Sequence, residues 1–316
     1  MGRYLVKRLV FLVWILLSVM FLAFLIIHLL PGDPAQAILQ QGWTPQLGAA
    51  LNKSLGLDKP LWQQYLSYVW NMAHLNFGTD WISGQPISQT LSQCLPPTIE
   101  MVLLSQLLAL VLAIPLATLA ALRPSGIFDR LANMGSFGLL SVPTYVVITL
   151  LYIPISEWLG VPNSGPASYV PFTQDWLANI ESLSIPIIAL SIGSFVVYFR
   201  VFRADLITSL QDEFITMARS KGISKSRILF RHAYRPSSVA LLSAIGVNMA
   251  GLITGTFIAE SVFQINGVGG QLLQATQQPD YQLIQAIVFV TATLIILINF
   301  AIDLLTGYID PRISRD

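Results

Sequence analysis

The sequence predicts an all-α polytopic membrane protein with six transmembrane helices. Of its 316 residues, 54% are hydrophobic and only 10% are charged. Apolar runs of roughly 20 residues recur along the chain, and that length crosses the hydrocarbon core of a bilayer. With six spans, all 17 lysines and arginines except Lys53 and Lys59 fall on one side. This asymmetry is typical of the cytoplasmic side of a membrane protein.

The N-terminal part contains one predicted span and one long outer segment. Basic residues precede an apolar run at residues 9–30, which is too long for a cleaved signal peptide. We therefore predict an N-terminal transmembrane helix at residues 1–30. Residues 31–95 contain no spanning run and form a predicted extracytoplasmic segment. Within it, residues 55–78 carry apolar and aromatic side chains at helical spacing, which fits either an interfacial helix or a small packed subdomain.

The remainder, residues 96–309, is predicted to form a five-helix core, and residues 310–316 a cytoplasmic tail. Prolines interrupt several of these apolar runs, which helix bundles in membranes tolerate. The predicted core spans are residues 96–122, 131–158, 180–199, 237–263 and 281–308.

The loop at residues 200–236 is the longest strongly polar segment and is rich in lysine and arginine. It has a helix, break, helix pattern, and in its first helix Phe214, Ile215, Met217 and Ala218 form an apolar stripe at helical spacing. Glu213 lies in the first turn, where an acid suits the helix dipole, and Gly222 ends the helix. The candidate docking surface consists of Glu213, Phe214, Met217, Ala218 and Gly222. The alternative is a solvated loop that only orients its neighbours.

The fifth predicted span carries two further candidate features. Gly251, Gly255 and Ala259 are spaced by four residues and predict a helix-packing face, unless they reflect the ordinary glycine content of membrane helices. Asn248 and Glu260 are polar residues in the same span and are weak candidates for a translocation path. Each can instead bond a neighbouring helix or lie near a helix end.

Several function classes lack their motifs. The chain has no phosphate-binding G-x-x-x-x-G-K-[ST] and no H-E-x-x-H, so we assign no catalytic residue. One cysteine and three well-separated histidines form no metal-ligand pattern, and a net charge of +1 gives no indication of nucleic-acid binding. A stand-alone secondary transporter is the main alternative, but internal inverted repeats are not evident. An intramembrane enzyme would require a catalytic constellation that is missing.

The polar loop resembles the EAA loop of ABC importer permeases. Residues 213–222, followed by Arg235 and Pro236, carry the resemblance, although Ala218 is the only alanine before the glycine where the family usually has Glu-Ala-Ala. The run Ala-Arg-Ser-Lys-Gly at residues 218–222 is similar to the dipeptide, oligopeptide and nickel branch. Matching segments span almost the whole chain: HLLPGDPA at residues 28–35, ESVFQINGVGG at residues 260–270 and DPRI near the C-terminus.

This resemblance implies a type I ABC importer permease fold that works by alternating access. The loop residues would contact an ATPase subunit. The implied partners are a second, homologous permease subunit, two ABC ATPase subunits that use ATP and Mg, and an extracytoplasmic substrate-binding protein. No cofactor would belong to this chain. The implied location is the bacterial cytoplasmic (inner) membrane, with both termini in the cytoplasm. The expected substrate is a di- or oligopeptide, with nickel or a nickel chelate as the alternative.

Overall fold

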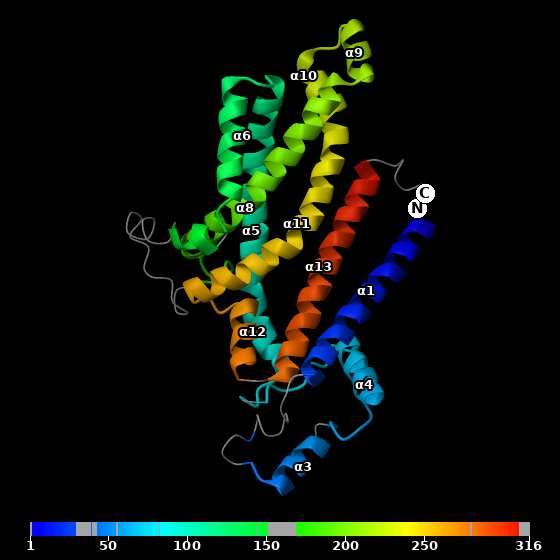
Figure 1. Ribbon diagram of the computed structural model, residues 1–316, viewed down its shortest axis with the longest axis vertical. Helices are drawn as coiled ribbons and strands as arrows, with labels where there is room; N and C mark the ends of the chain where they lie inside the picture. Colours follow the sequence, from blue (N-terminus) through cyan, green and yellow to red (C-terminus); the bar gives the residue numbers. More distant parts are fainter. Residues whose placement is uncertain are drawn as a thin grey trace. The chain divides into compact units, whose positions relative to one another are not determined.

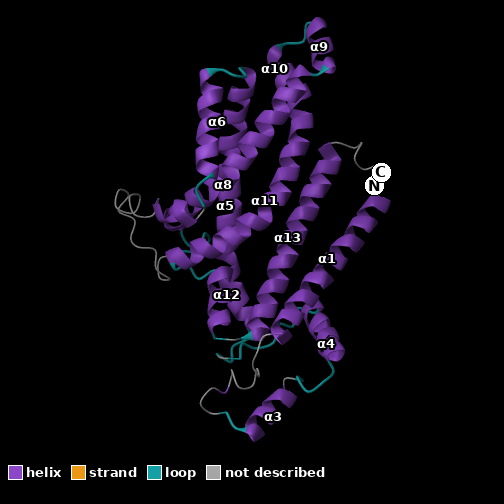
Figure 2. Cartoon of the chain, viewed as in Figure 1, coloured by secondary structure: helices purple, strands orange, loops and turns teal. Residues whose placement is uncertain are grey.

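The structure is a computed structural model that describes residues 2–29, 39, 43–54, 56–81, 83–143, 145–150, 169–278 and 280–309. These residues are nearly all helical (Figure 2), and their only β-pairing is a single antiparallel bridge between Thr79 and Pro86. The predicted all-α polytopic class is therefore confirmed. Five described helices are long and apolar enough to cross a membrane: Val6–Leu25, Ile87–Leu122, Trp176–Gln211, Lys225–Phe263 and Tyr281–Ile309.

The third predicted span, at residues 131–158, is described only in part. Helix α6 (Ile127–Leu140) covers its beginning, and residues 145–150 are also helical. Residues 151–158 lie outside the described residues. Helix α6 ends at Leu140, with Ser141 as its C-cap, and Pro143 opposes its continuation because a proline disfavours the helical conformation of the preceding residue, Val142. The third span therefore stays a prediction in its second half.

Two long helices extend beyond their predicted bounds. Helix α5 (Ile87–Leu122) begins before Pro96, the predicted start, and buries Leu91 and Cys94 along this extra stretch. Helix α8 (Trp176–Gln211) continues well past the predicted end of its span at residue 199. Arg200 and Arg203 therefore belong to a helix and not to the polar loop.

The chain forms two compact units, and the first comprises Met1–Pro96 and Asn266–Leu297. In this unit α1 (Gly2–Leu29) packs against α4 (Leu61–Ala73) through aromatic residues. The Tyr65 hydroxyl of α4 donates a hydrogen bond of 3.0 Å to the Leu17 carbonyl of α1, and its ring lies 5.6 Å from that of Phe24. Trp62 and Trp70, by contrast, are exposed. Helix α4 therefore combines a packed face with the exposed aromatics of an interfacial helix.

The first unit also contains α3 (Pro45–Ser54), α12 (Val268–Gln277) and the first part of α13 (Tyr281–Ile309). The turn before α5 is attached to the beginning of α13. The Trp81 backbone N–H donates to the Asp280 carboxylate at 2.7 Å, and the Trp81 indole donates to the Gln282 side-chain oxygen at 2.7 Å. These bonds join segments that are far apart in the sequence.

The second unit comprises Pro97–Ile265 and Ile298–Asp316. Helix α8 begins at Trp176 because the Asp175 carboxylate caps it, accepting from the N–H groups of Leu177 and Ala178 at 3.0 and 3.2 Å. It packs against α6 and α11 (Tyr234–Phe263), as Figure 1 shows. Its large side chains, including Tyr198 and Phe202, are almost fully buried.

The polar loop connects α8 to α11. It consists of α9 (Glu213–Ser220), α10 (Lys225–Arg227) and a π-helical segment, η2 (Ile228–Ala233). Figure 1 shows α9 and α10 beyond one end of α8 and α11. The predicted second short helix is not separate, because Lys225–Phe263 forms one continuous helical run into the fifth span.

Candidate functional site

Helix α9 has two apolar sides, and they have different surroundings. Ile215 and Ala218 are buried and pack with Ile228, and Leu210 and Ile223 border this cluster. Phe214 and Met217 remain 43% and 60% exposed. The cluster therefore fixes the inner side of α9, while Phe214 and Met217 form an exposed apolar ridge.

The structure corrects the predicted position of Ala218. The sequence predicts that Ala218 lies on one exposed ridge with Phe214 and Met217. Residues three and four apart both lie on one side of a helix, so spacing alone allows Ala218 to lie with either Phe214 or Ile215. In the structure Ala218 is buried with Ile215, whereas Phe214 and Met217 are exposed. Ala218 therefore belongs to the buried side of α9, which holds the helix in place, and not to the exposed ridge. Glu213 is exposed in the first turn of α9, as predicted, and Arg219 lies in the last turn.

Gly222 ends α9 through a specific backbone arrangement. Its φ is +72°, in the left-handed region that side chains disfavour. The Ile223 N–H donates to the Ala218 carbonyl at 3.2 Å, and the Gly222 N–H donates to the Arg219 carbonyl at 3.0 Å. This pair of bonds is the Schellman motif, and it brings Ile223 back onto the buried cluster. The predicted helix end at Gly222 is confirmed.

This geometry makes the loop sensitive to the residue at position 222. A Cβ there meets no described atom within 4 Å, so only the backbone conformation opposes a substitution. The left-handed conformation costs an L-residue roughly 1–2 kcal/mol, less for asparagine and more for a β-branched residue. We expect Gly222→Val to speed tryptic cleavage at Arg219 and Lys221, and Gly222→Asn to leave it near the wild-type rate. Equal protection of both variants would contradict this role.

A groove of about 840 Å³ lies beside α9. The turn between α5 and α6 forms one side of it, and α9 with the following α10 forms another. Its lining is mostly apolar, with Arg219 and Lys225 among the polar residues. The polar loop and the α5–α6 turn therefore border a common space.

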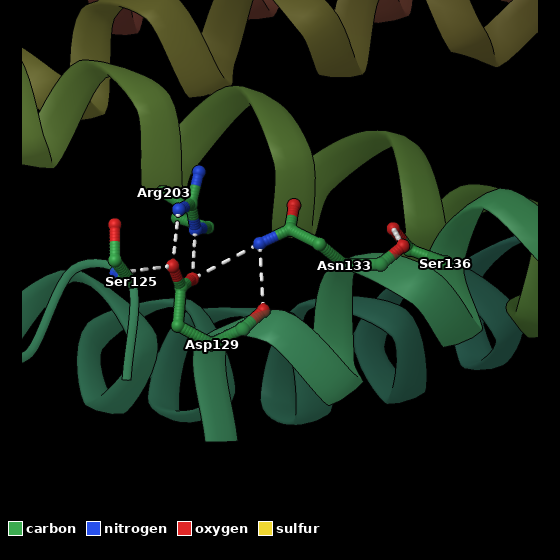
Figure 3. Close-up of polar contacts among 5 residues, drawn as sticks. All are labelled: Ser125, Asp129, Asn133, Ser136 and Arg203. Atoms are coloured by element: carbon green, nitrogen blue, oxygen red, sulfur yellow. Dashed lines mark hydrogen bonds and ion pairs between the residues drawn. The ribbon is translucent and has the colours of Figure 1, made fainter. Parts of the chain in front are cut away.

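The two arginines near the end of α8 both contact α6. The Arg203 guanidinium binds the Asp129 carboxylate through Nε and, at 2.6 Å, through Nη2 (Figure 3). The Arg200 guanidinium lies 4.3 Å from the centroid of the Phe137 ring. The hydrogen bonds from Arg203 hold the pKa of Asp129 below its usual value, against the opposing effect of burial. The pair is therefore ionised at neutral pH and is lost only as the pH falls through that lowered pKa.

Sequence reasoning did not identify Asp129. It explained Arg200 and Arg203 by topology alone, as basic residues on the cytoplasmic side. A single acid between Arg123 and Arg130 in a short basic loop was the signal that could have indicated a partner.

The two translocation-path candidates lie in helix contacts. The Asn248 amide donates to Ser194 Oγ at 2.8 Å and to Tyr198 Oη at 3.1 Å, both on α8. Glu260 is fully buried, and its carboxylate accepts a hydrogen bond of 2.6 Å from Thr98 on α5. These contacts favour the alternative that each residue bonds a neighbouring helix. A role in translocation stays a prediction.

The predicted small-residue face of α11 divides into two parts. A Cβ at Gly255 would lie 3.0 Å from Leu190 Cδ2 of α8, and Ala259 is fully buried. Gly251 is exposed and a Cβ there meets no described atom within 4 Å. Gly246, which the sequence analysis did not select, approaches Asn299 of α13, whose Oδ1 would lie 2.9 Å from a Cβ.

Comparisons with known proteins cover the whole chain. Residues 113–315 match the family described as "Binding-protein-dependent transport system inner membrane component", and residues 1–102 match the N-terminal region of such membrane components. The chain is 33% identical to a probable peptide ABC transporter permease protein, y4tP, of Sinorhizobium fredii, over 99% of both chains. It is 29% identical to the dipeptide transport system permease protein DppB of Escherichia coli K12, over 100% of this chain and 99% of that one.

The fold also has a relative among solved structures. An inward-facing structure of the MetNI methionine ABC transporter matches with a TM-score of 0.56 and 16% identity, over 71% of this chain and 98% of the other. At this identity the likeness concerns the fold alone.

Proposed function

The chain belongs to the family of binding-protein-dependent transport system inner membrane components, and from this we propose that it is the permease of an ATP-driven importer of di- or oligopeptides. The observation that carries the substrate class is the full-length similarity to permeases named for peptide and dipeptide transport. The nickel alternative gains no support from these relatives. The family is one of transport permeases, so the chain itself is not an enzyme.

The proposed assembly contains a second, homologous permease, two ABC ATPase subunits that use ATP and Mg, and an extracytoplasmic binding protein. It lies in the cytoplasmic membrane with both termini of this chain in the cytoplasm. The distribution of basic residues supports this orientation. The exposed ridge of Phe214 and Met217 supports an ATPase contact at α9. Glu213 extends the same surface at the beginning of that helix.

The geometry suggests how ATP hydrolysis would act on the spans. Helix α9 lies between the end of α8 and the beginning of the continuous run into α11. The buried cluster of Ile215, Ala218 and Ile228 joins α9 to the start of that run. A displacement of α9 by an ATPase would therefore reach the fourth and fifth spans directly. To shift a two-state equilibrium, the ATPase must contact α9 differently in the two states.

Reconstitution tests this function. The complex is purified from native membranes through a tag on this chain, its subunits are identified, and it is placed in ATP-loaded vesicles with the binding protein outside. We expect uptake of labelled di- and tripeptides that stops when a non-hydrolysable ATP analogue replaces ATP. ATP-independent uptake would indicate a secondary transporter. ATP-dependent uptake of nickel without peptide uptake would overturn the substrate class.

A further inference from the structure

We propose that Asp129 and Arg203 form a positioning clamp that makes α6 move together with the end of α8. A displacement of α9 would then reach the third predicted span as well as the fourth and fifth. This inference rests on the proposed function, because it requires an ATPase to act at α9.

The clamp has a single, fully bonded geometry. One Asp129 oxygen accepts from Arg203 Nε and, at 3.0 Å, from the Asn133 amide. The other accepts from Arg203 Nη2 at 2.6 Å and from the Ser125 backbone N–H at 2.9 Å (Figure 3). The carboxylate is only 4% exposed. A bidentate pair with a buried carboxylate and a partly buried guanidinium holds distance and orientation better than a mobile surface ion pair.

The clamp joins three parts of the second unit. Asp129 lies in the first turn of α6, and Arg203 lies on α8. Ser125 belongs to the turn between α5 and α6 and has a φ of +64°, an uncommon conformation for a non-glycine residue. The Asp129 carboxylate holds this turn through the Ser125 N–H. A shift of α6 along α8 that the Arg203 side chain cannot follow would break both bonds.

The clamp also lies close to α9, where the proposed function places the ATPase contact. Arg203 precedes the end of α8 at Gln211 by roughly two helical turns, or ~12 Å at 1.5 Å per residue. Pro124 of the α5–α6 turn lines the same groove as Arg219 of α9. The end of α8, the α5–α6 turn and α9 therefore meet within one small region.

Topology alone does not explain this pair. The positive-inside rule requires only a positive charge, which lysine supplies as well as arginine. Arg130, next to Asp129, is exposed and satisfies that rule. Arg203 instead uses its planar fork on both carboxylate oxygens, a geometry that lysine cannot reproduce. Arg200 strengthens the same helix pair through Phe137.

The test compares Arg203→Lys and Asp129→Asn with the control Arg130→Gln in the reconstituted complex. Arg203→Lys keeps the positive charge but removes the two parallel hydrogen bonds of the guanidinium group. Asp129→Asn keeps the size of the side chain but removes its negative charge. Peptide uptake per ATP hydrolysed is measured at equal amounts of assembled complex. We expect a fall of about fivefold or more in both clamp variants, in the range of ordinary coupling free energies, and no change in the control. A lower yield of complex with wild-type uptake per ATP would make the pair merely structural and overturn the proposal.

A second measurement keeps Asp129 and Arg203 unchanged, so it does not depend on whether Arg203→Lys and Asp129→Asn fold. Spin labels are placed on exposed Met134 of α6 and Thr208 of α8, in a Cys94→Ala background. The clamp predicts the same label distance in the ATP-free and vanadate-trapped complexes. If the mean distance between the two labels changes between these states by more than the width of the measured distance distribution, the clamp is refuted. If the wild-type complex itself shows no ATP-driven uptake, the proposed function fails, which is a different result from an altered ratio in the variants.

Discussion

We expect Ala218→Asp to abolish the ATP hydrolysis that binding protein and substrate stimulate in the assembled importer. Ala218 lies under α9 against Ile215 and Ile228. An aspartate there would bury a charge, which costs more than the roughly 1–3 kcal/mol of an unpaired neutral polar group. The eight-residue helix α9 is held mainly by the buried contacts of Ile215 and Ala218. Loss of these contacts would displace α9, and the exposed ridge of Phe214 and Met217 would be displaced as well.

Two matched variants separate this effect from a general effect of charge. Thr216→Asp adds the same charge on an exposed side of α9, away from the ridge, and should retain most of the stimulation. Met217→Asp places it on the exposed ridge, and should weaken ATPase binding while α9 stays as resistant to trypsin as in wild type. ATP hydrolysis by the purified complex in lipid measures all three. Full stimulation in Ala218→Asp would show that the loop is only a basic linker.

The second large effect is expected at Gly255. A Cβ there would already lie 3.0 Å from Leu190 Cδ2, and a leucine adds three further carbons toward α8. Overpacking of this kind typically costs about 1–3 kcal/mol. We expect Gly255→Leu to lower the thermal unfolding midpoint of the purified chain and to reduce assembly of the complex.

Gly251→Leu is the control for that substitution, because it adds the same side chain one helical turn away on an exposed position. Its unfolding midpoint should match that of wild type. If Gly251→Leu is stable yet blocks assembly, Gly251 faces a partner subunit. Equal destabilisation by both substitutions would refute the division of the α11 face into a packed part and an open part.

The sequence predicted the features that depend on composition and local conformation. Hydropathy located the long apolar helices, and the glycine at position 222 marked the end of α9 because few other residues adopt its conformation. The bounds of α5 and α8 were less predictable. Pro96 suggested a helix start, and Arg200 suggested a loop, yet packing continues both helices through these residues.

The remaining features depend on tertiary contacts. An eight-residue amphipathic segment with apolar residues on two sides does not reveal which side faces inward. Here Ile223 and Ile228, which follow α9 in the chain, decide that Ala218 is covered and Met217 is not. The partnership of Asp129 with Arg203 joins residues on different helices and carries no local signal.

The π-helical segment η2 determines how far α11 is rotated about its own axis relative to α9. A π-helical turn accommodates one more residue than an α-helical turn over the same stretch. Each residue of an α-helix turns it by roughly 100°, so this one residue determines which side of α11 lies in line with α9. The orientation of a whole membrane helix relative to α9 therefore depends on the six residues from Ile228 to Ala233.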